Sequence, residues 1–276
     1  MTTSFWDIQN ADVVVFMGSN AAENHPISFK WFLRAKQKGA KVIVVDPRYT
    51  RTASKADWWI PFRSGTDIAV LGGLINYAIT NNKIHRDYVV KYTNAALLVN
   101  EKFTFDEGLF SGWDPEAKRY NQSTWGFQTD ANGQPLADES LENPNTVYQH
   151  IKRIYSIYTP EKVSEISGIS VDDFKKLAEY VTSTGQAGKS AVFAYAMGWT
   201  QHTKGVQNIR CSTVLQMLLG NIGVRGGGMN ALRGHSNIQG LTDIGLMSNL
   251  IPGYLAIPTE KEVSFDQYMS TRGFKP

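Results

Sequence analysis

Two short runs of β-branched residues, separated by one stretch of helical pattern, constrain the fold more than any other feature. Residues 11–17 (ADVVVFM) and 41–45 (KVIVV) each have the length and composition of a strand buried on both faces. Between them, Pro26 suits the first turn of a helix that should end at Gly39. The order strand, helix, strand predicts two parallel strands joined by a right-handed crossover.

The rest of the chain continues this pattern. We expect further strands at residues 58–61 and 191–196, and helices near residues 68–80, 86–91, 146–155, 171–182 and 205–219. In residues 100–143, Gly, Asp, Asn and aromatic residues alternate without a sustained period. This stretch is predicted to be an irregular insertion outside the sheet, with a hairpin at Asn132-Gly133. The fold class is therefore α/β, with a doubly wound, mainly parallel sheet.

Composition excludes several classes of protein. The net charge of +3 over 276 residues is too small to indicate nucleic acid as the partner. No apolar run approaches the roughly 20 residues that span a bilayer, and the N-terminal residues lack the pattern of an export signal. The single cysteine, Cys211, excludes an intrachain disulfide and a cluster held by several thiolates of this chain. Its place in an amphipathic helix predicts a packed side chain.

The stretch from Gly226 to Gly240 is predicted to be a ligand-binding loop. It holds five glycines, one arginine, one histidine and three side-chain amides, with too few apolar residues for a core element. Glycine lets a ligand approach the main chain, while Arg, Asn, Gln and His supply hydrogen-bond donors. A surface linker is the alternative, but linkers seldom combine so many amides with an arginine.

Polar residues also follow four of the predicted strands. They are Ser19, Asn20 and Glu23; Asp46 and Arg48; Gly65, Thr66 and Asp67; and Gly198, Thr200 and Gln201. Ligands of parallel sheets bind beyond the carboxyl ends of the strands, where these loops converge. The sequence therefore predicts a large polar ligand at that edge.

Several of these residues have a second interpretation. Asp67 could cap the following helix as well as bind a ligand, and Asp46 could be a turn residue before proline. An ordinary NAD site is disfavoured, because the first strand is followed by Gly-Ser-Asn-Ala-Ala-Glu and not by Gly-x-Gly-x-x-Gly. His25, in Glu-Asn-His, suggests acid/base or metal chemistry, but a turn or cap role is the commoner one. His202 and His235 lack the spacing of a zinc site.

Together the motifs resemble a known family. They are Met-Gly-Ser-Asn-Ala-Ala-Glu-Asn-His-Pro (17–26), Val-Asp-Pro-Arg-Tyr-Thr-Arg-Thr-Ala (45–53), Arg-Ser-Gly-Thr-Asp (63–67), Gly-Trp-Thr-Gln-His (198–202) and Leu-Arg-Gly-His-Ser-Asn-Ile-Gln-Gly (232–240). The set is similar to the molybdopterin oxidoreductase superfamily, and more narrowly to the large subunit of membrane-associated respiratory formate dehydrogenases. The resemblance covers nearly the whole chain, and only the motifs in combination are specific.

The resemblance implies a Rossmann-like domain that binds molybdopterin guanine dinucleotide carrying Mo or W. It places Asn20 and its neighbours near the diphosphate, Asp46 and Asp67 near the guanosine, and Met197, Gly198 and Gln201 near a pterin. The further cofactor-binding residues that it implies are Gly18, Glu23, Arg48, Gly65, Asn237 and Gln239. Arg233 matches the active-site arginine, and His235 occupies a position that varies between branches. The implied reaction is the oxidation of formate to carbon dioxide.

Departures from the family pattern are equally informative. The four-cysteine iron–sulfur segment and the selenocysteine or cysteine ligand beside a catalytic histidine are absent from this sequence. We therefore expect an internal piece of a catalytic subunit, with a cofactor-binding domain at 1–234 and the beginning of a second α/β domain at 235–276. Alone, it should be inactive and metal-poor.

The partners implied are formate, the rest of the same subunit with its 4Fe-4S cluster, an iron–sulfur subunit and a membrane cytochrome b subunit, at the periplasmic side of a membrane. Two alternatives stay open at this point. The chain could belong to another superfamily member, such as a nitrate reductase-like enzyme, although the Arg-Gly-x-x-Asn-x-Gln-Gly setting of Arg233 favours formate. It could also be a non-catalytic scaffold in an electron-transfer complex, although retention of all the polar loops is evidence against that.

Overall fold

The computed structural model describes residues 1–235, 237–246 and 249–273 of the chain. These residues divide into two compact units, 1–232 and 233–276, which are described separately. The predicted division into domains after residue 234 stays a prediction.

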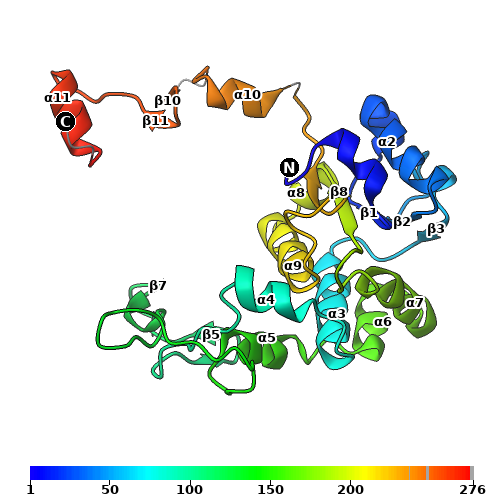
Figure 1. The fold of residues 1–276 in the computed structure, drawn as a ribbon, viewed down its shortest axis with the longest axis horizontal. Coiled ribbons are helices and arrows are strands. Elements are labelled where there is room, and N and C mark those ends of the chain that lie inside the picture. The colour runs from blue at the N-terminus through cyan, green and yellow to red at the C-terminus, as the bar shows by residue number, and fades with distance from the viewer. Residues whose placement is uncertain (236, 247–248, 274–276) are drawn as a thin grey trace. The chain divides into compact units, whose positions relative to one another are not determined.

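A sheet of five strands forms the centre of the first unit (Figure 1). Its spatial order is β3-β2-β1-β8-β9, and every neighbouring pair is parallel. The strands are β1 (Val13–Met17), β2 (Lys41–Val45), β3 (Trp58–Ile60), β8 (Ala191–Tyr195) and β9 (Gly228–Ala231). Val15 of β1 pairs with Ile43 on one side and Phe193 on the other. The predicted parallel sheet is thereby confirmed.

Both faces of this sheet are covered, because successive side chains of a strand point to opposite faces. Val13, Val15 and Met17 belong to one buried cluster, and Val14 and Phe16 to the other. The first cluster includes residues from α3 (Asp67–Thr80), α6 (Pro160–Ser167), α7 (Val171–Thr182) and α9 (Gly205–Leu218). The second includes residues from α2 (Pro26–Gln37) and the 3-10 helix η1 (Phe5–Asn10). The predicted doubly wound architecture is confirmed (Figure 1).

Local sequence signals explain most helix boundaries. Ser170 caps α7 by accepting a hydrogen bond from the Asp173 amide at 3.1 Å, as expected for a helix N-terminus. Sequence analysis missed α6, although Thr159 caps it in the same way and Gly168 ends it with φ of +78°. The remaining helices of the first unit are α1 (Ala21–Asn24), α4 (Arg86–Tyr92), α5 (Val147–Tyr155) and α8 (Met197–Thr200), and two further 3-10 turns are η2 (Ala53–Lys55) and η3 (Gln122–Thr124).

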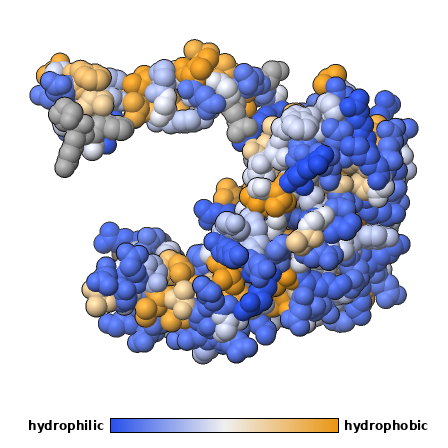
Figure 2. All heavy atoms as spheres, viewed as in Figure 1, coloured by the Kyte–Doolittle hydropathy of each residue, from blue (hydrophilic) through white to orange (hydrophobic). Residues whose placement is uncertain are grey.

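The insertion contributes no strand to the main sheet. Its antiparallel pairs are β4 (Phe105–Asp106) with β5 (Leu109–Phe110), and β6 (Trp113–Asp114) with β7 (Arg119–Tyr120). The chain turns back at Asn132-Gly133, where Thr129 and Pro135 form an antiparallel bridge. Apolar surface is visible among hydrophilic side chains in this region (Figure 2), and its exposed residues include Phe105, Leu109 and Trp113.

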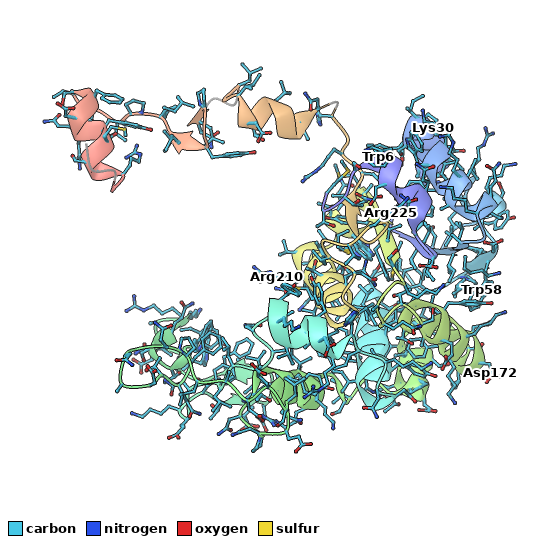
Figure 3. All side chains as sticks on the ribbon, in the orientation of Figure 1. Trp6, Lys30, Trp58, Asp172, Arg210 and Arg225 are labelled. Carbon is cyan, nitrogen blue, oxygen red and sulfur yellow. The ribbon has the colours of Figure 1, made fainter. Side chains whose placement is uncertain are left out.

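The expectation of a loop throughout 226–240 was wrong. Residues 228–231 form the edge strand β9, and residues 238–243 form α10, a helix of the second unit. Few apolar side chains are needed there, because residues at the N-terminus cover β9: Thr2 donates its amide to the Met229 carbonyl at 3.0 Å, and its hydroxyl accepts from the Met229 amide at 2.8 Å. Beside this edge, Arg225, which is labelled in Figure 3, donates to the side chain of Asn10 at 3.0 Å.

The second unit contains α10 (Ile238–Asp243), β10 (Leu250–Ile251), β11 (Leu255–Ala256) and α11 (Phe265–Thr271). The two short strands pair antiparallel. Glu262 and Arg272 form an ion pair of 2.6 Å that joins α11 to the segment before it.

A buried amide network fixes β9 against β8. Gln216 of α9 has no exposed surface, and its Nε2 donates to the carbonyls of Ala191 and Gly228, both at 2.8 Å. Its Oε1 accepts from Asn221 Nδ2 at 2.9 Å. Every polar atom of this side chain therefore serves the junction of the two strands.

We expect Gln216→Leu to lower the free energy of unfolding by about 3 kcal/mol, because buried carbonyl and amide groups lose their partners. Urea denaturation at constant pH measures this change. Gln207→Leu, at an exposed site on the same helix, is the matched control and should change stability little. Equal effects of the two substitutions would show that the network contributes nothing specific.

Candidate cofactor-binding site

Two glycines bring the loops after β1 and β8 into direct contact. The amides of Ala196 and Gly198 both donate to the Gly18 carbonyl, at 3.1 and 3.0 Å. A Cβ atom on Gly198 would lie 2.6 Å from the Gly18 Cα, and Gly18 itself has φ of +75°. Both positions therefore require glycine, one for space and the other also for backbone conformation.

The loop after β1 is also tied to the segment after β2. Asn20 Oδ1 accepts from the Thr52 hydroxyl at 2.8 Å, and its Nδ2 donates to Glu23. Glu23 lies 3.6 Å from the Arg51 guanidinium. In this structure, then, the side chains of Asn20 and Glu23 hold two loops together at the carboxyl edge of the sheet.

Asp67 is a buried carboxylate at the first position of α3. It is 3% exposed, and its Oδ2 has no hydrogen-bond partner among the described residues. Burial raises its pKa, the charge of Asp46 acts in the same direction, and His202 and Trp199 oppose the shift. The His202 Nδ1 lies 3.6 Å from Asp67 Oδ2. A buried carboxylate of this kind is unusual unless a partner satisfies it.

The cap interpretation of Asp67 does not explain that burial. The N-cap of α3 is Thr66, and no side chain caps the helix. The Thr66 hydroxyl donates instead to the Arg63 carbonyl at 2.6 Å. Asp67 still benefits from the helix dipole, because a negative charge in the first turn is favourable.

Asp46 has the geometry of a turn residue, and its role in the turn uses only one of its two carboxylate oxygens. Its Oδ1 accepts from the Arg48 amide at 2.9 Å, which is the geometry of a turn that follows a strand. Its side chain is half-buried, and burial raises its pKa while Arg48 lowers it. The charge of this carboxylate contributes to the raised pKa of Asp67.

Several buried polar atoms in the segments that follow the carboxyl ends of the strands have no hydrogen-bond partner in the described part of the chain. Among the described residues of these segments they are Ser19 Oγ, Asp67 Oδ2, Trp199 Nε1 and Asn208 Nδ2. Most buried polar atoms in proteins are hydrogen-bonded, so such a group indicates a missing polar partner. Trp199 was not predicted as a site residue, although it belongs to the motif Gly-Trp-Thr-Gln-His (198–202). Asn208 gave no signal beyond being polar on a buried face of α9.

The other candidates of the first unit form an exposed rim. The side chains of Glu23, Arg48 and Gln201 are exposed, and Met197 is 51% exposed. Gly65 has φ of +84° and open space where a side chain would be. These residues are therefore accessible to solvent or to a ligand.

Four predicted residues lie in the second unit. Arg233 and His235 have exposed side chains, and Asn237 adopts a left-handed conformation at the start of α10, with φ of +51°. Of Gln239 the structure describes only its place in α10. These residues are described within their own unit.

The remaining reactive side chains are accounted for locally. Cys211 is buried, and burial raises its pKa to about 12, so the prediction of a packed thiol is confirmed. His25 joins α1 to α2 through its backbone, and its Nδ1 lies 2.6 Å from Asn24 Oδ1. Within the part of the chain that the structure describes, no three His, Cys, Asp or Glu residues gather as a metal site. Among the same residues, no helix has the length and apolar character of a membrane span.

This geometry defines an α/β protein with a doubly wound parallel sheet and a polar site at the carboxyl edge of its strands. The chain belongs to the molybdopterin oxidoreductase family, whose model matches residues 1–265.

Known relatives agree with that assignment. The chain is 53% identical to "Formate dehydrogenase, nitrate-inducible, major subunit" of Escherichia coli (strain K12), over 98% of its own length and 27% of that protein. It is 50% identical to "Formate dehydrogenase subunit alpha" of Megalodesulfovibrio gigas, over 100% of this chain and 27% of that one. It thus spans about a quarter of the length of these relatives.

A solved structure supports the fold. Acetylene hydratase from Pelobacter acetylenicus matches 81% of this chain and 25% of its own, with a TM-score of 0.53 and 20% sequence identity. At that identity the likeness concerns the fold alone.

The residues present fit the molybdopterin cofactor that the family name states. The Gly18–Gly198 contact joins two loops at the edge where parallel sheets commonly bind ligands, and four buried polar atoms lack partners in these segments. Phosphate oxygens and ring N–H groups are the complementary partners of hydroxyl, amide, indole and carboxylate groups.

The buried carboxylate predicts a cost in stability. Because the pKa of Asp67 is raised in the folded protein, its contribution is favourable at acid pH and is lost as pH rises through the folded pKa. We expect Asp67→Asn to raise the free energy of unfolding at pH 7 by about 1 kcal/mol, and the gain to vanish at acid pH. Urea denaturation at both pH values checks this, with Asp106→Asn at an exposed site as control. Destabilisation at pH 7 would contradict the stated sign.

Proposed function

We propose that this chain is the cofactor-binding portion of a formate dehydrogenase catalytic subunit. The reaction converts formate to carbon dioxide, releasing one proton and two electrons. The observation that carries the proposal is 53% identity, over 98% of the chain, to the nitrate-inducible major subunit of the E. coli enzyme. The molybdopterin cofactor, when bound, supplies the acceptor for the two electrons.

Arg233 holds the substrate in this proposal. Its guanidinium is charged at every physiological pH, and its planar fork can donate two parallel hydrogen bonds to the formate carboxylate. His235, two residues further on, also has an exposed side chain and is proposed to act beside it.

The cofactor is proposed to be a molybdopterin guanine dinucleotide with Mo or W. Asp46 and Asp67 would accept hydrogen bonds from its guanosine, since ionised carboxylates only accept. Gly18 and Asn20 would lie at the diphosphate, and Met197, Gly198 and Gln201 at a pterin. Glu23, Arg48, Gly65, Asn237 and Gln239 complete the proposed set.

Electrons would pass to a 4Fe-4S cluster of the complete subunit, then to an iron–sulfur subunit and a membrane cytochrome b subunit. A periplasmic, membrane-associated enzyme fits that chain of partners. The 276-residue chain alone is proposed to be inactive and metal-poor.

A segment exchange tests the function. The matching 270 residues of the E. coli major subunit would be replaced by this chain, and formate-dependent reduction of a viologen dye measured in the purified chimera. We expect activity within about tenfold of the parent, because an exchange at this identity keeps the core pattern. A folded, cofactor-loaded chimera that reduces nitrate with reduced dye, and leaves formate unchanged, would contradict the proposal.

A further inference from the structure

His202 and Trp199, in the segment that contains α8, both act on the buried Asp67 carboxyl group. His202 Nδ1 lies 3.6 Å from Asp67 Oδ2, and the fully buried Trp199 acts on the same carboxyl group. Trp199 Nε1 and Asp67 Oδ2 both lack hydrogen-bond partners among the described residues. Gly198, between Met197 and Trp199, donates to Gly18 at 3.0 Å and so fastens the segment to the loop after β1.

Two influences compete at Asp67. Burial and the nearby charge of Asp46 favour the protonated carboxylic acid, whereas His202 and Trp199 favour the carboxylate. Arg48 acts on Asp46 in turn. Its backbone amide donates a hydrogen bond to the Asp46 carboxylate, and both this bond and the charge of Arg48 lower the pKa of Asp46. Asp46, Arg48 and His202 are thus the charged and titratable groups that decide which form Asp67 takes.

We propose that His202 is a positioning residue that keeps Asp67 ionised and aims its carboxylate at adjacent N–H donors of a guanine base. This inference rests on the guanine dinucleotide proposed above. It adds a device for selecting the base, built from a residue that need not touch the ligand.

The ionisation state of Asp67 matters because guanine and adenine present different hydrogen-bonding groups. Guanine presents two neighbouring N–H donors on one edge, which match the two oxygens of a carboxylate, whereas adenine presents a donor beside an acceptor. An ionised Asp67 therefore discriminates between the two bases. A protonated Asp67 would donate a hydrogen bond and lose much of that discrimination.

The test uses GDP and ADP as probes on the complete 276-residue chain, with dissociation constants measured by calorimetry at a series of pH values from acid to neutral. The unaltered chain should prefer GDP, and the preference should weaken as pH falls and Asp67 is protonated. Without His202 the pKa of Asp67 rises further, so His202→Gln should move this loss to higher pH. At a pH where the variant has lost its preference for GDP and the unaltered chain has kept it, the GDP affinity of the variant should be about tenfold lower.

Two further variants separate positioning from packing. His202→Arg places a permanent cation at this position. It should return the pH at which the preference for GDP is lost toward that of the unaltered chain. His150→Gln makes the same change on α5, outside the carboxyl-edge loops, and should have no effect. If the unaltered chain prefers GDP and His202→Gln loses that preference at the same pH, the role of His202 is overturned but the guanosine placement is not. Equal affinity of the unaltered chain for GDP and ADP would overturn the guanosine placement as well.

Discussion

Replacing Gly198 with valine should separate the two loops that meet at the carboxyl edge and lower the free energy of unfolding by about 3 kcal/mol or more. The first added carbon would lie 2.6 Å from both the Cα and the carbonyl oxygen of Gly18. Backbone atoms cannot move aside as a flexible side chain can. The Gly198 amide would then lose its 3.0 Å hydrogen bond to Gly18, and Trp199 its fixed place.

Urea denaturation gives the stability change, and hydrogen exchange of the amides of residues 196–198 locates it. Gly126→Val is the matched control, because nothing lies within 4 Å of a Cβ at that position. Slow amide exchange in Gly198→Val, equal to that of the unaltered chain, would show that the loops tolerate the contact.

Replacing Arg233 with lysine should cost the chimeric enzyme at least about a hundredfold in kcat/KM for formate. Lysine keeps the positive charge but loses the planar fork, so a carboxylate is no longer held in one orientation. We expect KM to rise and kcat to fall together, because orientation matters in binding and in the reacting complex.

Steady-state dye reduction over a range of formate concentrations measures both constants. Arg225→Lys, whose native guanidinium donates to Asn10 in the first unit, is the control and should retain normal kinetics. Normal kinetics in Arg233→Lys would remove Arg233 from the proposed substrate site.

The sheet could be predicted from sequence because its strands are buried on both faces. Residues 13–17 and 42–45 have almost no exposed surface. Strands buried on both faces require continuous apolar runs, and these two runs are short enough to favour strands over helices. The α3 helix was predicted at residues 68–80, within one residue of its bounds in the structure. The edge strand β9 was missed because Gly228 and Asn230 weaken its pattern, and its pairing with β8 and cover by Thr2 are long-range.

The position of the candidate site at the carboxyl edge could be predicted from the sheet topology, but the contacts between its side chains could not. Polar residues after parallel strands must gather at one edge, so Asp46 and Asp67 could be named from sequence. That Asp67 is buried, that His202 faces it and that Trp199 lacks a partner depend on how α8 is fastened through Gly198. No local pattern in the sequence encodes a contact between segments 180 residues apart, such as Gly18 and Gly198.

A structure of the cofactor-loaded chimera is the most direct test of the proposed cofactor site. We predict a guanine base at the carboxyl edge of the sheet, with its neighbouring N–H groups within hydrogen-bond distance of the Asp67 carboxylate. The formerly unpartnered Oδ2 would then be satisfied. A cofactor bound elsewhere, with Asp67 still buried and unpaired, would contradict it.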